Sequence, residues 1–233
     1  NFNERHDGRL FFNTGRRLNN GFIRLGHSVL EFSDRDIVKH YKSIKDYTGA
    51  NTLNEKLINT VYNYKPDLLI FGHADLIKNN TLHYLKDNYK DLKIAQWFLD
   101  PLIKNGPDYN KNKMRILDKI NNTDANFITT SPDVLNFLPK NKKCLFMPNP
   151  TDHSFEILNN YENNNCSMDV FFALSHGVHR GILKRGKYDE RADFVNKLVE
   201  LTPNVKFDLY GIDNVQPIWA DSFLKAISNS KMG

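Results

Sequence analysis

Apolar residues along this chain gather in short blocks that predict strands separated by helices. Before residue 150 we predict strands at residues 9–13, 29–33, 68–72, 94–99, 127–130 and 144–147. Between them, apolar residues recur at helical spacing, as at Leu53, Leu57 and Val61, and a short helix at 18–25 ends at Gly26. Strands that alternate with helices are typical of an α/β fold with a parallel sheet covered by helices on both faces.

A second and shorter series of the same kind begins at residue 168. It contains predicted strands at 168–174 and 205–211 and predicted helices at 190–201 and 218–230. We therefore expect two Rossmann-like α/β domains, at residues 1–155 and 168–233, joined by a polar linker at 156–167. A parallel sheet of two strands would leave most of its apolar surface uncovered, so the second domain is expected to be incomplete.

Composition and charge narrow the class of protein. Hydrophobic residues make up 40% of the chain and charged residues 25%, as in ordinary globular proteins, and no apolar run reaches the roughly 18 residues of a membrane helix. The net charge is +5, but the charges are scattered, so we expect no nucleic-acid partner. Cys144 and Cys166 have no metal or redox spacing, which favours a reducing compartment and a cytoplasmic protein. The chain lacks an initial Met, so we expect a fragment or processed form, and a removed signal peptide remains an alternative.

Polar residues follow two of the predicted strands in the first domain. His73 and Asp75 come directly after one strand, and Asp100 ends the next, close to Trp97. Open α/β sheets bind ligands at the carboxyl ends of their strands, so His73, Asp75 and Asp100 are candidate catalytic residues, with His73 or Asp75 as general base. Trp97 is a candidate for stacking on an acceptor. The alternatives are a helix cap for Asp75 and a core position for Trp97.

The turn after the first predicted strand contains Gly15 and Arg16. A dinucleotide-binding domain would place a G-x-G-x-x-G fingerprint there, but only one glycine is present, so this kind of cofactor site is not expected. Gly15 and Arg16 stay candidates for contact with an acceptor, and a solvated turn is the alternative.

The loop after the first strand of the second domain is the best candidate for binding an anion. Its glycines allow close approach of the backbone to a ligand, and its basic residues suit phosphate oxygens. Tyr210 and Gly211 end the next strand at the same sheet edge. The candidate donor-binding residues are Gly177, Arg180, Lys184, Arg185, Tyr210 and Gly211. His176 and His179 alone are too few ligands to predict a metal site, and a basic surface loop is the alternative.

Several short motifs, in this order, resemble the two-domain GT-B type glycosyltransferases. More narrowly, they resemble the bacterial group related to the spore-maturation (CgeB-like) glycosyltransferases. The matching motifs lie at residues 21–29, 65–70, 95–101, 130–133, 147–150 and 208–211, and include Gln96-Trp97-Phe98-Leu99-Asp100-Pro101 and Asp208-Leu209-Tyr210-Gly211.

This resemblance implies a glycosyltransferase that moves a sugar from a nucleoside-diphosphate sugar to a glycan or other cell-surface acceptor. It implies an N-terminal acceptor domain and a C-terminal donor domain, with the loop 177–185 facing the diphosphate and with neither metal nor cofactor. Further donor contacts of such enzymes lie beyond the position of Gly233, so we expect this chain by itself to bind a donor poorly. The alternative is a two-domain small-molecule binding protein of periplasmic type, which would carry a secretory signal upstream.

Overall fold

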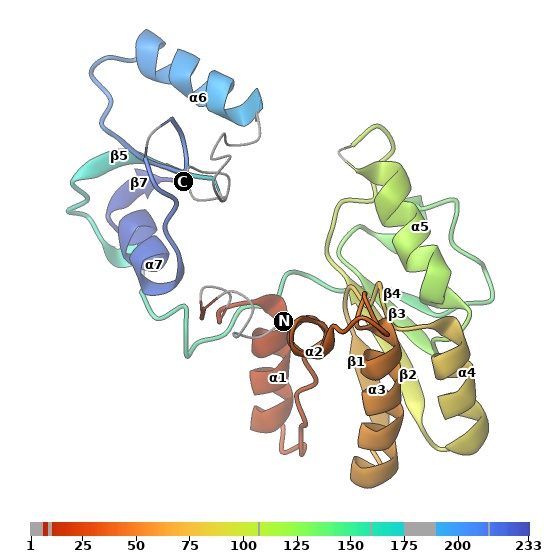
Figure 1. Cartoon of the computed structure of the whole chain (residues 1–233). Coiled ribbons are helices and arrows are strands. Elements are labelled where there is room, and N and C mark those ends of the chain that lie inside the picture. Colours follow the sequence, from red (N-terminus) through yellow and green to blue (C-terminus); the bar gives the residue numbers. More distant parts are fainter. Residues whose placement is uncertain (1–6, 9–10, 107, 159, 175–189, 214) are drawn as a thin grey trace. The chain divides into compact units, whose positions relative to one another are not determined.

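The computed structural model describes residues 7–8, 11–106, 108–158, 160–174, 190–213 and 215–233. The chain divides into two compact units (Figure 1). Unit 1 consists of Asn1–Gly8 and Asn13–Thr151, and unit 2 consists of Arg9–Phe12 and Asp152–Gly233. Each unit contains its own parallel sheet with helices, which confirms the predicted α/β class.

The sheet of unit 1 has four parallel strands in the order β1-β2-β3-β4. They are β1 (Leu68–Phe71), β2 (Lys93–Phe98), β3 (Ala125–Ile128) and β4 (Cys144–Phe146). All four were predicted from apolar runs of strand length. Parallel strands in sequential order require a crossover between each pair, and their carboxyl ends lie at one edge of the sheet.

Helices α3 (Ala50–Tyr64), α4 (Asn79–Asn88) and α5 (Tyr109–Ile120) pack on one face of this sheet. Figure 1 shows α3 and α4 on the same side of the strands. Ile94 of β2 belongs to a core cluster with residues of α3 and α4. Phe98, four residues further along the same strand and on the same face, packs with Ile116 of α5. The short 3-10 helix η2 (Pro132–Val134) lies between β3 and β4 and follows Ser131, with Pro132 at its first position.

The opposite face of the sheet is less well covered than was predicted. Side chains alternate between faces along a strand, so Ile70, Trp97 and Phe127 lie on this second face. These three are half-buried, while Leu68 and Leu145 are 42% and 39% exposed. Most of the burial in this unit therefore comes from the face under α3, α4 and α5.

The two predicted strands nearest the N-terminus are wrong. Residues 28–33 form an extended segment without sheet pairing, between α1 (Thr14–Arg24) and α2 (Asp34–Tyr41). Of the predicted strand 9–13, residues 9 and 10 lie outside the described residues, and Phe11 and Phe12 form a turn. Their rings pack against Phe155 in unit 2, at centroid distances of 5.6 and 4.6 Å. For Phe11 and Phe12, aromatic packing thus replaces the pairing with a neighbouring strand that was predicted.

The start of α3 also differs from the prediction. Thr52-Leu53-Asn54-Glu55 has the form of a capping box, which predicts a helix start at Thr52, but the helix begins at Ala50, after Gly49. The carboxylate of Asp46 accepts the backbone N–H of Thr52 at 2.9 Å, so a residue from the preceding loop caps the helix.

Unit 2 contains a parallel sheet of three strands in the order β6-β5-β7. The strands are β5 (Met168–Ala173), β6 (Phe207–Tyr210) and β7 (Ser230–Met232), and the helices are α6 (Glu190–Leu201), α7 (Ala220–Ser228) and the 3-10 helix η3 (Asn160–Glu162). Two strands were predicted, and a helix was predicted through Ser230. The third strand exists because Ser230–Met232 pairs with β5, with Met168 opposite Ser230.

Candidate functional site

Two side chains that were predicted from separate strand ends meet at the carboxyl edge of the unit 1 sheet. His73 follows β1 and Asp100 follows β2, and these strands are paired in parallel. The Nε2 atom of His73 lies 3.2 Å from Oδ2 of Asp100. A carboxylate this close to one ring nitrogen favours the tautomer with the proton on that nitrogen, which leaves the other nitrogen available to accept a proton.

Arg115 of α5 joins the predicted Asp75 to the same group. Its Nε and Nη2 atoms donate to the two carboxylate oxygens of Asp75 at 2.7 and 2.9 Å, a bidentate pair. Its Nη1 atom lies 3.7 Å from Oδ2 of Asp100. His73, Asp75, Asp100 and Arg115 therefore form one cluster, which we call the β1–β2 edge cluster.

The members of the β1–β2 edge cluster differ in exposure. The side chains of His73 and Arg115 are 23% and 21% exposed, whereas those of Asp75 and Asp100 are 50% and 41% exposed. The imidazole also lies 5.2 Å from the ring of buried Phe98. The two carboxylates thus face solvent, while the histidine is held between Asp100 and an apolar wall.

Burial lowers the pKa of His73 below its ordinary value of 6.5. The charge of Asp100 opposes this change and raises the pKa, and the charge of Arg115 lowers it. Because the lowering prevails, the shift in pKa favours the neutral form of His73, which is the form that a general base needs.

The N-terminus of α2 adds two further charges near the cluster. Burial raises the pKa of Asp34, and the negative charge of Asp75 contributes to the rise. The charge of Arg35 acts on His73 in the direction that lowers its pKa. The sequence alone did not indicate Asp34 or Arg35, because α2 lies far from β1 in the chain and approaches it only through packing on α3.

Buried Asn54 of α3 holds the loop that contains Asp75. Its Nδ2 donates to the carbonyl of Leu76 at 2.9 Å, and its Oδ1 accepts the N–H of Lys78 at 2.8 Å. Asp75 is therefore restrained on both sides, by the loop anchored on α3 and by Arg115 of α5. The alternative interpretation of Asp75 as a helix cap is wrong, since α4 begins at Asn79 after Lys78.

Trp97 lies against Gly72 at the end of β1. A Cβ atom at Gly72 would lie 2.5 Å from Cζ2 of the indole, so this position requires glycine for the ring to approach. Trp97 is half-buried and lies on the sheet face opposite Phe98. Its indole packs against Gly72, the residue before His73, and its role toward an acceptor stays a prediction.

Gly15 and Arg16 lie in the first turn of α1 and not in a turn after a strand. Asn13 caps this helix by accepting the N–H of Arg16 at 3.0 Å. The guanidinium of Arg16 forms an ion pair with Glu31 in the segment after α1. The structure thus assigns Arg16 a partner outside the β1–β2 edge cluster.

Four of the predicted donor-binding residues, Gly177, Arg180, Lys184 and Arg185, lie outside the described residues. Tyr210 and Gly211 lie at the carboxyl end of β6, as predicted. Gly211 has φ +71°, a left-handed conformation that favours glycine. Burial raises the pKa of Tyr210, whose ring packs 5.9 Å from Phe171.

Unit 2 contains a hollow of about 310 Å³ at the carboxyl end of β5. It is lined by Ala173, Leu174, Arg191, Ile218, Trp219 and Phe223. Among the described residues, the lining is mainly apolar and aromatic and includes the cation of Arg191, which is suited to a ligand that has a flat ring and an anionic group. Trp219 and Arg191 were not among the predicted site residues.

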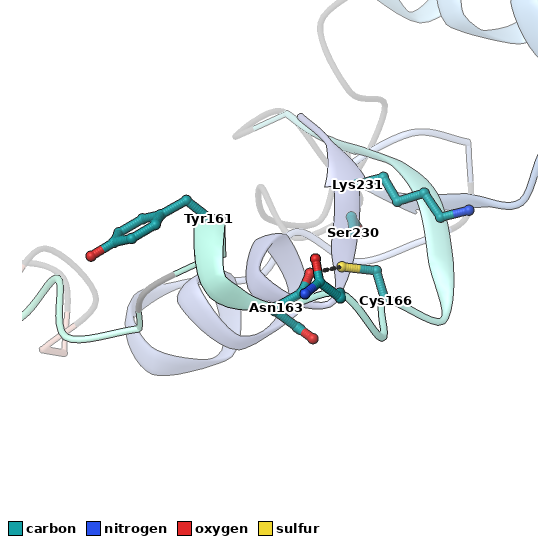
Figure 2. A pocket seen from close by; sticks show the side chains of 6 residues that line it. Tyr161, Asn163, Cys166, Ser230 and Lys231 are labelled. Carbon is teal, nitrogen blue, oxygen red and sulfur yellow. Dashed lines mark hydrogen bonds between the residues drawn. The ribbon is translucent and has the colours of Figure 1, made fainter.

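A second hollow of about 440 Å³ lies near the amino ends of β5 and β7 (Figure 2). Cys166 donates its S–H to the carbonyl of Asn163 at 3.5 Å, and Tyr161 and Lys231 extend in opposite directions. Lys231 is paired with Asp169 at 2.7 Å. This hollow is the larger of the two, but it lies away from the carboxyl strand ends where α/β sheets bind ligands, and its described lining residues include no histidine or carboxylate, so we assign no chemistry to it.

Within the described part of the chain, no group of three or more His, Cys, Asp or Glu side chains could hold a metal ion. No described helix is long and apolar enough to span a membrane. In comparisons with known proteins, no family model matches the chain and no curated protein matches it by sequence.

Proposed function

We propose that this chain belongs to a glycosyltransferase, which moves a sugar from a nucleoside-diphosphate sugar to a hydroxyl group of a glycan or other cell-surface acceptor. The observation behind the proposal is the contact between His73 and Asp100, 3.2 Å apart at the carboxyl edge of a parallel sheet. A neutral histidine oriented by a carboxylate is suited to activating a hydroxyl group, and this edge is where such sheets bind ligands. The ordered motifs that resemble the GT-B group support the same reaction.

In the proposed reaction, His73 is the general base. In this proposal the Asp100 carboxylate, 3.2 Å from Nε2, favours the tautomer with the proton on Nε2, so Nδ1 accepts the proton of the acceptor hydroxyl. The acceptor oxygen forms a bond with the anomeric carbon of the donor, and the bond from that carbon to the diphosphate breaks. The diphosphate leaves with the bonding electron pair, and the proton stays on His73 as an imidazolium stabilised by Asp100.

The charges around His73 favour an uncharged acceptor. Asp75 and Asp100 are the more exposed members of the cluster, and the guanidinium of Arg115 is engaged by both of them. An acceptor with a carboxylate or phosphate near the reacting hydroxyl would face two carboxylates and no unpaired cation of the cluster. A neutral sugar or polyol hydroxyl avoids this repulsion.

On the donor side, the hollow at the end of β5 is a proposed site for the nucleotide. Trp219 offers a surface on which a base can stack, and Arg191 offers a cation for a phosphate. We propose a cytoplasmic location, since nucleotide sugars are donors inside cells and the two cysteines are free.

The test is release of nucleoside diphosphate from a panel of nucleotide sugars by the protein as its gene encodes it, with and without neutral sugar acceptors. Turnover is expected with at least one donor, and His73→Gln should lower kcat by about 10²–10⁴-fold, the usual contribution of a general base. His83→Gln is the matched control, because His83 is exposed on α4. Tight ligand binding without turnover would instead favour the two-domain binding protein, and equal loss in both variants would remove His73 as the base.

A further inference from the structure

The main chain next to Asp100 is held by two hydrogen bonds and by the burial of a side chain, and none of these involves a residue of the β1–β2 edge cluster other than Asp100 itself. The Nδ2 of Asn112 donates to the carbonyl of Pro101 at 3.1 Å. The N–H of Leu102 donates to Oγ1 of Thr130 at 3.3 Å, and the side chain of Leu102 is 1% exposed within the core. The proline ring also restricts Asp100 to extended conformations. The backbone that carries the Asp100 carboxylate is therefore fixed immediately after it.

Asn112 and Arg115 are three residues apart on α5, so they lie on the same face of that helix. Arg115 contacts the carboxylates of Asp75 and Asp100, and Asn112 contacts the main chain after Asp100. The rotation of α5 is fixed as well, since the Nε2 of buried Gln96 donates to the carbonyl of Ile116 at 3.1 Å. Residues of α5 thus hold both the main chain next to Asp100 and the carboxylate of its side chain.

Asn112 is 3% exposed, and its bond reaches an otherwise irregular segment between β2 and α5. A buried amide in such a place contributes little apolar burial, and its hydrogen bond determines where the segment runs. We propose that Asn112 is a positioning residue: through the carbonyl of Pro101 it aims the Asp100 carboxylate at Nε2 of His73. The catalytic role of His73 rests on the proposed function, but the positioning role does not.

The consequence for His73 follows from the charges that face it. These are Asp100 after β2, Asp75 in the loop after β1, Arg115 on α5 and Arg35 on α2. Asp100 and Asp75 raise the pKa of His73, whereas Arg115 and Arg35 lower it. If Asp100 turns away when Asn112 is replaced, its stabilisation of the imidazolium is lost, and the pKa of His73 should fall further.

The experiment is a proton NMR titration of the histidine rings in the protein as its gene encodes it, with His73 assigned from the His73→Gln spectrum. Asn112→Ala and Asn112→Leu, which keeps roughly the size of the side chain but removes the donor without adding a charge, should both lower the pKa of His73. Asn122→Ala is the matched control. Asn122 is also 3% exposed, and its Nδ2 also makes one hydrogen bond, to Asn79, but at the far end of α5.

The control should leave the pKa of His73 unchanged. In turnover with a donor sugar, the two Asn112 variants should lower kcat about tenfold with little change in KM, because orientation and not binding is affected. Thr130→Val provides a second approach if the Asn112 variants fail to fold, and it should lower the pKa of His73 as well. Folded variants with an unchanged His73 pKa would overturn the positioning role. A lowered pKa in a protein without turnover would support it while overturning the proposed function.

Discussion

The carboxyl ends of the strands are built differently in the two units. In unit 1, the ends of β1 and β2 carry ionisable side chains in direct contact, and Trp97 fills the space over Gly72 so closely that no Cβ would fit. In unit 2, the end of β5 opens into a hollow of about 310 Å³ with an aromatic lining. The first edge thus has polar groups in close contact with one another, and the second has empty space.

Under the proposed function, this difference corresponds to a catalytic group in unit 1 and a ligand-binding site in unit 2. A general base needs close contacts that set its tautomer and its pKa, and these contacts leave little empty volume. A binding site for a flat ring needs empty volume and an apolar wall. The size of a hollow alone would therefore have pointed to unit 2 and away from the candidate catalytic group.

The largest expected effect tests how tightly the unit 1 edge is packed. In Gly72→Ala the new methyl group would overlap the Trp97 indole, and relieving the overlap should destabilise the protein by about 1–3 kcal/mol, the usual cost of overpacking. Gly21→Ala in α1 is the control, because a Cβ there meets nothing within 4 Å and alanine favours a helix. Urea denaturation measures both. Equal stability of Gly72→Ala and the original protein would show that the Trp97 indole can move aside without cost, so that the edge is not tightly packed.

A smaller effect tests whether the unit 2 hollow binds a nucleotide. Trp219→Ala removes the largest aromatic wall of the hollow and should weaken nucleoside-diphosphate binding about tenfold, within the range of one stacking contact. Phe194→Ala, on the exposed surface of α6, should leave the affinity unchanged. Calorimetric titration distinguishes the two outcomes. If both variants bind as well as the original protein, the hollow is not the nucleotide site, and the proposed binding role of the unit 2 edge is wrong.

The smallest expected effect tests the electrostatics of the unit 1 edge. Arg115→Gln removes a charge that lowers the pKa of His73, so the pKa should rise toward its ordinary value of 6.5. Turnover requires neutral His73 and should therefore fall as the pH drops through this pKa, with the acidic limb at higher pH in the variant than in the original protein. The same lowered pKa means that the folded state binds fewer protons than the unfolded state, so its stability decreases as the pH falls below about 6.5.

The control for this prediction is Lys111→Gln, which removes one positive charge from an exposed position one turn earlier on α5. It should leave the acidic limb of the pH profile in place. A pH profile that does not move in Arg115→Gln either would mean that Arg115 does not act on the titrating group.

How far the sequence alone could predict this protein depended on how local each signal was. Leu68–Phe71 is apolar throughout and Lys93–Phe98 mostly so, which is sufficient to predict parallel strands and to place His73 and Asp100 at one edge. The apolar blocks at 9–13 and 29–33 gave the same signal and were wrong, because a strand also needs a paired neighbour. Phe11 and Phe12 instead pack with Phe155, far away in the chain.

By itself the sequence determined the α/β class and the four strands of the first sheet, and placed His73, Asp75 and Asp100 at the ends of two of them. Only the tertiary structure decided which side chains complete the group. Arg115 and Asn112 lie on a helix whose rotation depends on packing against β2, and β7 is a strand because β5 offers it a partner. Strand ends can be read from a local run of apolar residues, whereas the facing of a helix and the pairing of a short polar strand depend on residues distant in the chain.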